Sequence, residues 1–379
     1  MKINLIILYF IKLCLFIKSP LAQNNTSNVI KQSKVFIPFK FLPDDDKKKY
    51  QENQTDNVYI SAGGISDSFT TFYDQLSDFE KESYSKIYEI SKKTPPEFQV
   101  SVDYDDTTEK LDYSTLEKKI ESSSYNIITT IMYDYPELWW IGSFSYSIQD
   151  YNNNTYKITF KLKPSNSKFY NFSVDNFMNL NRKIDTIKID VMKKINDLNL
   201  TTDYAKLRYI HDYLIVKNTY LLDESRKHIR NIYGSIVENI CVCEGYAEAF
   251  QYLALQYNIN CIIARSATHE WNLVEMNNVW YVVDVTWDDP GNALTGYGFN
   301  KDIETLYFLT GTNTLTDNSH TLVYSAFKNH NAFDYPVISE TDYVASDAET
   351  SEVTTMRNSF TNSYLSTANG ISFFLIYCP

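Results

Sequence analysis

Two cysteines separated by one residue, Cys241 and Cys243, are the first candidates for chemistry in this chain. The residues that follow Cys243, EGYAEAFQYLALQY, are good helix formers, and their apolar members recur with helical spacing. A buried helix is therefore predicted to begin at or just before Cys243. Unpaired N–H groups at a helix N-terminus stabilise a thiolate, lower its pKa and can hold a developing oxyanion. This position suits a nucleophile.

The segment THEWNLVEMNNVWYVVDVTWDDP offers a base for such a nucleophile. Its two halves, residues 270–276 and 279–286, are rich in β formers and flank Asn277-Asn278, which predicts a hairpin with a two-residue turn. Pairing Met276 with Val279 fixes which residues of the two strands share a face.

This register places His269 and Asp284 on one face of the sheet. Asp284 lies opposite Trp271, and His269 is its diagonal neighbour, within reach at ~7 Å. A three-residue turn would send Asp284 to the other face. We expect His269 to act as general base and acid and Asp284 to orient its imidazole.

Taken singly, each of these residues has a simpler explanation: a small buried cysteine, a packed or surface histidine, a solvated aspartate. In combination they predict a thiol enzyme that attacks an amide or ester carbonyl and forms a thioacyl intermediate. Transfer of the acyl group to water makes a hydrolase, and transfer to an amine makes a cross-linking transferase. The sequence leaves both outcomes open.

Three segments carry a resemblance to a known family: VCEGYA (Val242 to Ala247), HEWN (His269 to Asn272) and WYVVDVTWDDP (Trp280 to Pro290). Together they resemble the motifs of the transglutaminase-like superfamily. The stretches YDQLSDFEKESYSKIY, YPELWWIG, RYIHDYL and YFLTGTNTLTDNSHT resemble a subgroup found in bacteria and some microbial eukaryotes, so the similarity covers residues 66–340.

The resemblance implies an α+β fold of papain-like architecture, with an antiparallel sheet packed on the helix that bears the nucleophilic cysteine. It also implies that Cys243 is the nucleophile, His269 the base and acid, and Asp284 the group that fixes the imidazole. No calcium loop is visible, so a calcium-gated transglutaminase of the animal type is not expected. No cofactor or metal is predicted.

The elements that must position these residues follow from hydrophobic periodicity. A helix with a Ser77/Glu80 capping box opens the ordered region, and a second helix is predicted over Ser114 to Met132. A β-hairpin turns at Asn152 to Asn154, and two further helices span Asn176 to Leu198 and Tyr204 to Val216. A helical and β-hairpin region therefore precedes the cysteine-bearing core.

The sequence predicts that the chain consists of five consecutive segments. Residues 1–22 have the lysine, apolar run and small residue of a signal peptide, although Lys12, Lys18 and Pro20 also fit a membrane anchor. A polar, flexible leader is predicted over 23–65, an N-terminal α+β region over 66–172, and the catalytic domain over 173–340. The segment 341–379 is rich in Ser, Thr and Asn; its apolar end reads as a final edge strand or as a truncated gene product.

Charge and composition restrict the partners. Removal of residues 1–22 takes away three lysines, which leaves 32 basic against 47 acidic residues and a formal charge of −15. Such an acidic chain argues against nucleic acid or anionic membrane as a partner. A peptide or protein substrate is expected from the thiol chemistry described above. Export agrees with six Asn-x-Ser/Thr sequons, although an Asn-rich chain produces such triplets by chance. The abundance of Asn, Lys, Ile and Tyr indicates a coding bias.

Other aromatic and histidine residues have less specific roles. Trp271, Trp287 and Trp140 are candidates to bind substrate or to shield the His–Asp pair, and core packing is the alternative for each. His211 is expected on a helix face. His320 and His330 lie too far along the chain from any Cys, Asp or Glu cluster to suggest a metal site.

Two questions remain open at the level of sequence. Cys241 and Cys261 either pack or form a redox disulfide, which depends on geometry. The rival to an enzyme is a non-catalytic transglutaminase-like module that binds a surface or cell-wall polymer. An intact set of Cys243, His269 and Asp284 argues for the enzyme, because binding needs no such set.

Overall fold

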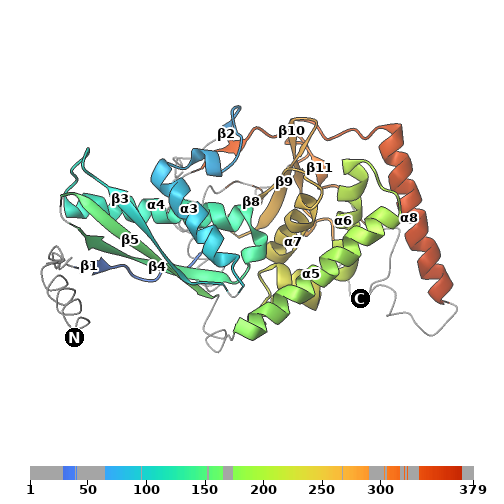
Figure 1. The fold of residues 1–379 in the computed structure, drawn as a ribbon. Coiled ribbons are helices and arrows are strands. Elements are labelled where there is room, and N and C mark those ends of the chain that lie inside the picture. The colour runs from blue at the N-terminus through green and yellow to red at the C-terminus, as the bar shows by residue number, and fades with distance from the viewer. Residues whose placement is uncertain are drawn as a thin grey trace, which may run out of the picture.

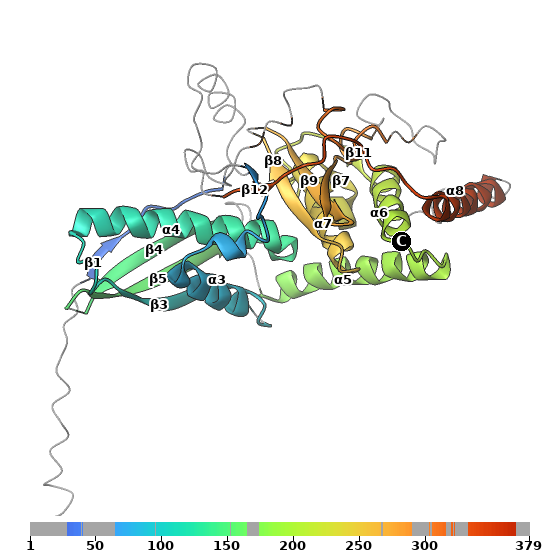
Figure 2. The same cartoon turned by 90° about the horizontal axis from the view of Figure 1, so that it is seen from above.

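The computed structural model describes residues 29–38, 40, 65–94, 96–151, 153–164, 174–266, 268–289, 303, 305–315, 320, 322 and 333–368. The described chain is an elongated α+β structure with two antiparallel sheets (Figures 1 and 2). The predicted signal peptide and the predicted final edge strand lie outside the described residues, and so does His330. No helix in the described ranges is long and apolar enough to cross a membrane.

The N-terminal sheet has the strand order β1-β4-β5-β3. Its central strands form the predicted hairpin, and Asn153 and Asn154 adopt the left-handed conformation in its turn. Helices α3 and α4 pack against each other, and α4 lies along the sheet (Figure 2). The bounds are β1 Val29–Gln32, β3 Gln99–Asp105, β4 Ile141–Asp150, β5 Thr155–Pro164, α3 Asp78–Ser91 and α4 Tyr113–Asp134.

The expectation of a flexible leader is wrong for part of it. Val29–Gln32 pairs with β4, and Phe36 forms a further bridge to Phe144. The Phe36 ring stacks on Phe144 and Tyr146, so it is 4% exposed. A short edge strand can be held by a few backbone hydrogen bonds and one buried aromatic side chain. A polar segment can therefore form such a strand without showing a hydrophobic periodicity in its sequence.

The second half holds the helix that begins at Cys243. Helix α7 (Cys243–Leu255) packs on a sheet of order β11-β10-β9-β8. The long helix α6 (Asp203–Lys217) packs against α7, and α5 (Val174–Asp197) packs against α6 (Figure 1). The strands are β8 Cys261–Arg265, β9 Glu270–Met276, β10 Val279–Val283 and β11 Phe308–Thr310. The predicted helices are confirmed, with ends shifted by one or two residues.

Short elements join distant parts of the chain. Strand β2 (Ile65–Ser66) pairs with β12 (Tyr335–Pro336), and β6 (Thr219–Tyr220) pairs with β7 (Ile240–Cys241), the strand that leads into α7. Single turns η2, η3 and η5 occupy Tyr73–Gln75, Pro136–Leu138 and Gly234–Glu238.

Helix α8 (Asp347–Ala368) was not predicted from the sequence. It lies beside α6 at one end of the molecule (Figures 1 and 2). The Glu352 carboxylate accepts the backbone N–H groups of Thr201 and Thr202, both at 3.0 Å, and so caps the N-terminus of α6 from outside. Ser and Thr are weak helix formers, so this helix depends on tertiary contacts.

Among the residues that the structure describes, asparagine occupies seven of the nine positive-φ positions that are not glycine. Asn153, Asn154, Asn199, Asn239, Asn258, Asn277 and Asn278 all have φ between 53° and 63°. Asparagine tolerates this region better than other residues with a side chain. These residues end helices or make hairpin turns, which are the roles that glycine usually fills.

A cavity of about 780 Å³ lies between η2, α3 and the far end of α7, away from Cys243. Asp134 lines it and accepts a 2.6 Å hydrogen bond from Tyr84. Burial raises the pKa of Asp134 to about 7, and the neighbouring Glu137 and Asp74 add to the rise. This carboxyl group is therefore protonated in the fold at mildly acidic pH.

The raised pKa predicts that Asp134→Asn stabilises the protein above pH 7. The unfolded chain releases this proton near pH 4, whereas the folded chain holds it until about 7. Wild-type stability should therefore fall across this window by up to about 4 kcal/mol relative to a variant that cannot ionise. Urea unfolding of both proteins at pH 4 and pH 8 measures this difference.

Asp105→Asn, at the end of β3, is the matched control for this prediction. Hydrogen bonds from the side chain and the backbone of Thr107 lower the pKa of Asp105, so its replacement removes stability above pH 4 and adds none above pH 7. Equal unfolding curves for wild type and Asp134→Asn at pH 8 would contradict the prediction.

Candidate active site

Cys243 is the first residue of α7, as predicted. Val242 is the N-cap residue, and its N–H donates to the Ile229 carbonyl at 3.0 Å, which holds the entry to the helix in place. The Cys243 residue is 4% exposed. The thiol therefore lies at the N-terminal end of a helix but just below the surface.

The hairpin that carries His269 and Asp284 has the predicted register. Met276 pairs with Val279, and each further pair along β9 and β10 keeps this alignment up to Asn272 and Val283. Asn277 and Asn278 have φ of 54° and 63°, as a two-residue type I′ turn requires.

His269 and Asp284 are in contact, as the register predicts. His269 Nε2 forms a hydrogen bond with Asp284 Oδ2, and Oδ1 accepts the backbone N–H groups of Thr286 at 3.0 Å and Trp287 at 3.1 Å. Burial works against the charge of Asp284, but the charges of His269 and His320 and the hydrogen bonds from these two histidines lower its pKa to about 2. Asp284 is thus a carboxylate that can only accept hydrogen bonds.

The surroundings of Cys243 differ from the sequence expectation. Its Sγ donates to Glu244 Oε2 at 3.3 Å. Burial raises the pKa of the Cys243 thiol well above its usual range, and the charges of Glu244 and Glu270 raise it further. A backbone hydrogen bond from Glu270 works in the opposite direction and places the thiol beside the residue that follows His269. With its pKa raised in this way, Cys243 rests as a thiol.

Three buried glutamates around Cys243 were not identified from the sequence. Glu244 pairs with Arg230 at 2.8 Å, and Glu248 pairs with Lys40 of the N-terminal segment. Burial raises the pKa of Glu270 to about 8. A signal for Glu244 and Glu270 existed, because each directly follows a residue of the predicted set. The Lys40 partner had no local signal.

Two of the three candidate tryptophans lie at this site. Trp271 is stacked near His269, with ring centroids 5.7 Å apart, and its Nε1 has no hydrogen-bond partner among the described residues. Trp287 lies 5.9 Å from the His269 ring and is 40% exposed, so it forms the solvent edge. Trp140 is 1% exposed, and its described ring contacts are with Phe98 and Phe177. The structure therefore gives Trp140 a core environment.

His320 joins the site although the sequence analysis set it apart from every cluster, so that expectation is wrong. His269, Asp284 and His320 each offer a possible metal-ligand atom, and these atoms lie within 4.8 Å of one another. However, both imidazoles present Nε2 to the same Asp284 oxygen, at 3.0 Å for His320. A shared ion would need ~2 Å to each ligand atom. The arrangement is that of hydrogen bonds.

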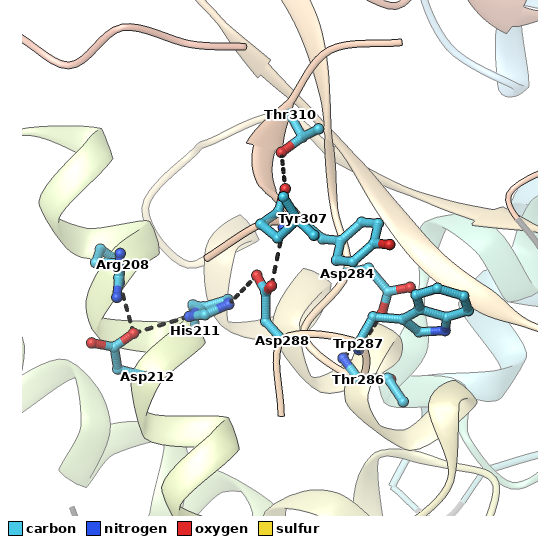
Figure 3. A network of polar contacts seen from close by, with 10 residues as sticks. Arg208, His211, Asp212, Asp284, Thr286, Trp287, Asp288, Tyr307 and Thr310 are labelled. Atoms are coloured by element: carbon cyan, nitrogen blue, oxygen red, sulfur yellow. Dashed lines mark hydrogen bonds and ion pairs between the residues drawn. The ribbon is translucent and has the colours of Figure 1, made fainter. Parts of the chain in front are cut away.

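His211 lies on α6, as expected, but on a buried face of this helix. It is fully buried, and its Nδ1 and Nε2 contact Asp212 Oδ1 at 2.9 Å and Asp288 Oδ2 at 3.0 Å (Figure 3). Burial alone would lower the pKa of His211, but the two aspartates raise it overall. Asp288 Oδ1 also accepts the Tyr307 N–H at 3.0 Å. This network ties α6 to the turn that follows Asp284.

The remaining described cysteines are free and buried. A side chain at Gly245 would meet the Cys241 Cβ at 2.5 Å, so glycine allows α7 to pack closely on Cys241. Burial raises the pKa of both Cys241 and Cys261. Of the alternatives left open by the sequence, the structure has both residues packed.

Comparisons with known proteins add little to this geometry. No protein-family model matches the chain, and no curated protein matches it. A solved structure described as "Crystal structure of a TGase" is similar at a TM-score of 0.26 and 12% identity, over 37% of this chain. The match spans 44% of that protein's chain.

Proposed function

We propose that the protein is a thiol enzyme that attacks peptide or protein amides through a thioacyl intermediate, as a hydrolase or a transamidase. The observation that carries the proposal is the contact between His269 and Asp284, in the predicted register, beside the helix that begins at Cys243. The resemblance to the transglutaminase-like superfamily supports the same roles for the same residues.

The hydrogen bonds of Asp284 assign the tautomer of His269. Because an ionised Asp284 can only accept, neutral His269 must carry its proton on Nε2. Nδ1 then holds the lone pair and is the atom that accepts the thiol proton. Asp284 keeps this tautomer and stabilises the imidazolium that forms.

The reaction proceeds in two balanced steps. Cys243 Sγ attacks the carbonyl carbon as its proton passes to His269; the C–N bond then breaks, and His269 returns the proton to the departing amine. Water or a second amine then attacks the thioester and gives a proton to His269. The C–S bond breaks, the acyl group leaves as an acid or an amide, and His269 returns the proton to Cys243 Sγ. N–H groups in the first turn of α7 are suited to stabilise the oxyanion.

The resting thiol sets one condition on this mechanism. Because burial and the neighbouring glutamates keep Cys243 protonated, deprotonation has to accompany attack on a bound substrate. Substrate entry from the exposed edge at Trp287 would bring the carbonyl to His269 and Cys243. We also propose that residues 173–340 form the catalytic domain and that the protein is exported.

The proposal is tested with the purified mature chain. It is incubated with dimethylcasein and dansylcadaverine, and with a peptide library, while amine incorporation, ammonia release and peptide cleavage are followed. Acid-quenched enzyme is then analysed by mass spectrometry for an acyl group on the peptide that contains Cys243. Turnover together with an acyl-Cys243 peptide supports the proposal, and turnover with acyl groups elsewhere contradicts it.

The burial of Cys243 and its raised pKa favour one rival, a non-catalytic module that binds a wall or surface polymer. Such a module would pull down with purified cell-wall polymer, release no product from it, and bind equally well as Cys243→Ala. Product release by the wild type excludes this rival.

A further inference from the structure

We propose that His320 is a positioning residue of this site: its Nε2–H holds the Asp284 carboxylate in the orientation that His269 requires. The inference rests on the proposed function, since it gives His320 a task in that reaction. The hairpin register does not require a second histidine here, and the resemblance gave no role to His320, which lies in the stretch YFLTGTNTLTDNSHT.

The hydrogen bonds around Asp284 carry the argument. Oδ2 accepts from His269 and, at 3.0 Å, from His320, whereas Oδ1 accepts two backbone N–H groups of the following turn. A carboxylate has about four lone-pair sites, so all of them are used. The backbone donors fix one oxygen and His320 fixes the other. The carboxylate plane therefore cannot rotate away from His269 without breaking a bond in a buried site.

The surroundings of His320 hold its ring in one place. Its side chain is 2% exposed, and its ring lies 4.8 Å from Trp271, 5.2 Å from Trp287 and 5.2 Å from Tyr307. Its titratable neighbours include Asp284, His269 and Tyr307. A histidine held on several sides by aromatic rings is a rigid donor, as a positioning residue must be.

His320 itself is not the base. The thiol is hydrogen-bonded by the backbone of Glu270, the residue next to His269, whereas His320 reaches the site through Asp284. His320 also has to keep its Nε2 proton to donate to an acceptor that cannot donate in return. It therefore acts through Asp284 and His269.

Two replacements separate positioning from packing. Glutamine at 320 can extend an amide N–H to the Asp284 oxygen but lacks the aromatic ring, whereas phenylalanine fills the aromatic cage but cannot donate. If His320 positions Asp284, His320→Phe should lower kcat roughly 10- to 100-fold with KM within twofold of wild type, as expected for the loss of a hydrogen bond to a charged group. His320→Gln should keep kcat within about threefold.

The measurements are kcat and KM for wild type and both variants, with melting temperatures to establish that each is folded. A kcat at least tenfold higher for His320→Gln than for His320→Phe supports the inference. Equal kcat values, or the higher value for His320→Phe, would overturn it, because a packing role favours the ring.

An activity-independent measurement separates this inference from the proposed function. With [15N]histidine-labelled protein at pH 8, NMR reports the tautomer of His269 among the five histidines of the chain. We expect the Nε2–H tautomer alone in wild type and His320→Gln, and both tautomers in His320→Phe. If the wild type shows no turnover but the three proteins show these tautomers, the proposed function is wrong and the positioning role of His320 is supported. One unchanged tautomer in all three proteins would overturn the positioning role.

Discussion

Replacement of Cys243 by alanine should abolish both amide hydrolysis and amine incorporation. Loss of a nucleophile that acts with its base removes the covalent route, and the expected fall in kcat is on the order of 10⁴-fold or more. Cys243 is the first residue of α7, so alanine, a strong helix former, leaves the helix intact. The measurement is turnover of the best substrate from the panel at saturating concentration.

Cys241→Ala provides the matched control. Cys241 is as deeply buried, lies two residues away, and packs on Gly245, so its loss leaves a small cavity and costs roughly 1 kcal/mol of stability. We expect its kcat to stay within about threefold of wild type. Equal activity of wild type and Cys243→Ala would rule out a thioacyl mechanism on Cys243. A loss of kcat in Cys241→Ala but not in Cys243→Ala would show that Cys241 is the nucleophile.

Asp212→Ala should cause the largest loss of stability among single changes in the buried network shown in Figure 3. Asp212 is fully buried and accepts from Arg208 at 2.7 Å and from His211 at 2.9 Å. Its removal leaves the Arg208 guanidinium, 7% exposed, without its buried carboxylate. Breaking a buried pair in this way costs about 3–5 kcal/mol.

Asp203→Ala on the same helix is the comparison for this prediction. Asp203 pairs with Lys206 at 3.0 Å, but its side chain is 55% exposed. Exposed pairs and first-turn acids contribute less than about 1 kcal/mol. Urea unfolding at pH 7 measures both variants. If the two lost equal stability, burial of the network would not explain its contribution.

The hairpin and the helices were predictable because their signals are local. A two-residue Asn-Asn turn fixes the alignment of β9 with β10, and alternation then decides which face each residue takes. The contact of His269 with Asp284 follows from that register alone. The capping box at Ser77 and Glu80 marked the start of α3 in the same way.

The remaining parts of the site come from tertiary contacts between distant residues. His320 lies 36 positions from Asp284, and Lys40 lies 208 positions from Glu248. No hydrophobic period and no hairpin register places such pairs in contact, because the tertiary fold brings them together. The pKa of Cys243 escaped prediction for a related reason: the helix N-terminus is visible in sequence, whereas burial beside Glu270 is not.

The left-handed asparagines agree with the coding bias that the amino-acid composition indicates. The whole chain has 10 glycines in 379 residues, and at seven described positions with positive φ it uses asparagine where glycine is common. Glycine codons are rich in G and C, whereas asparagine codons begin with two adenines. A mutational drift toward A and T can therefore exchange glycine for asparagine and still close the same turns, since asparagine is among the residues that this region penalises least.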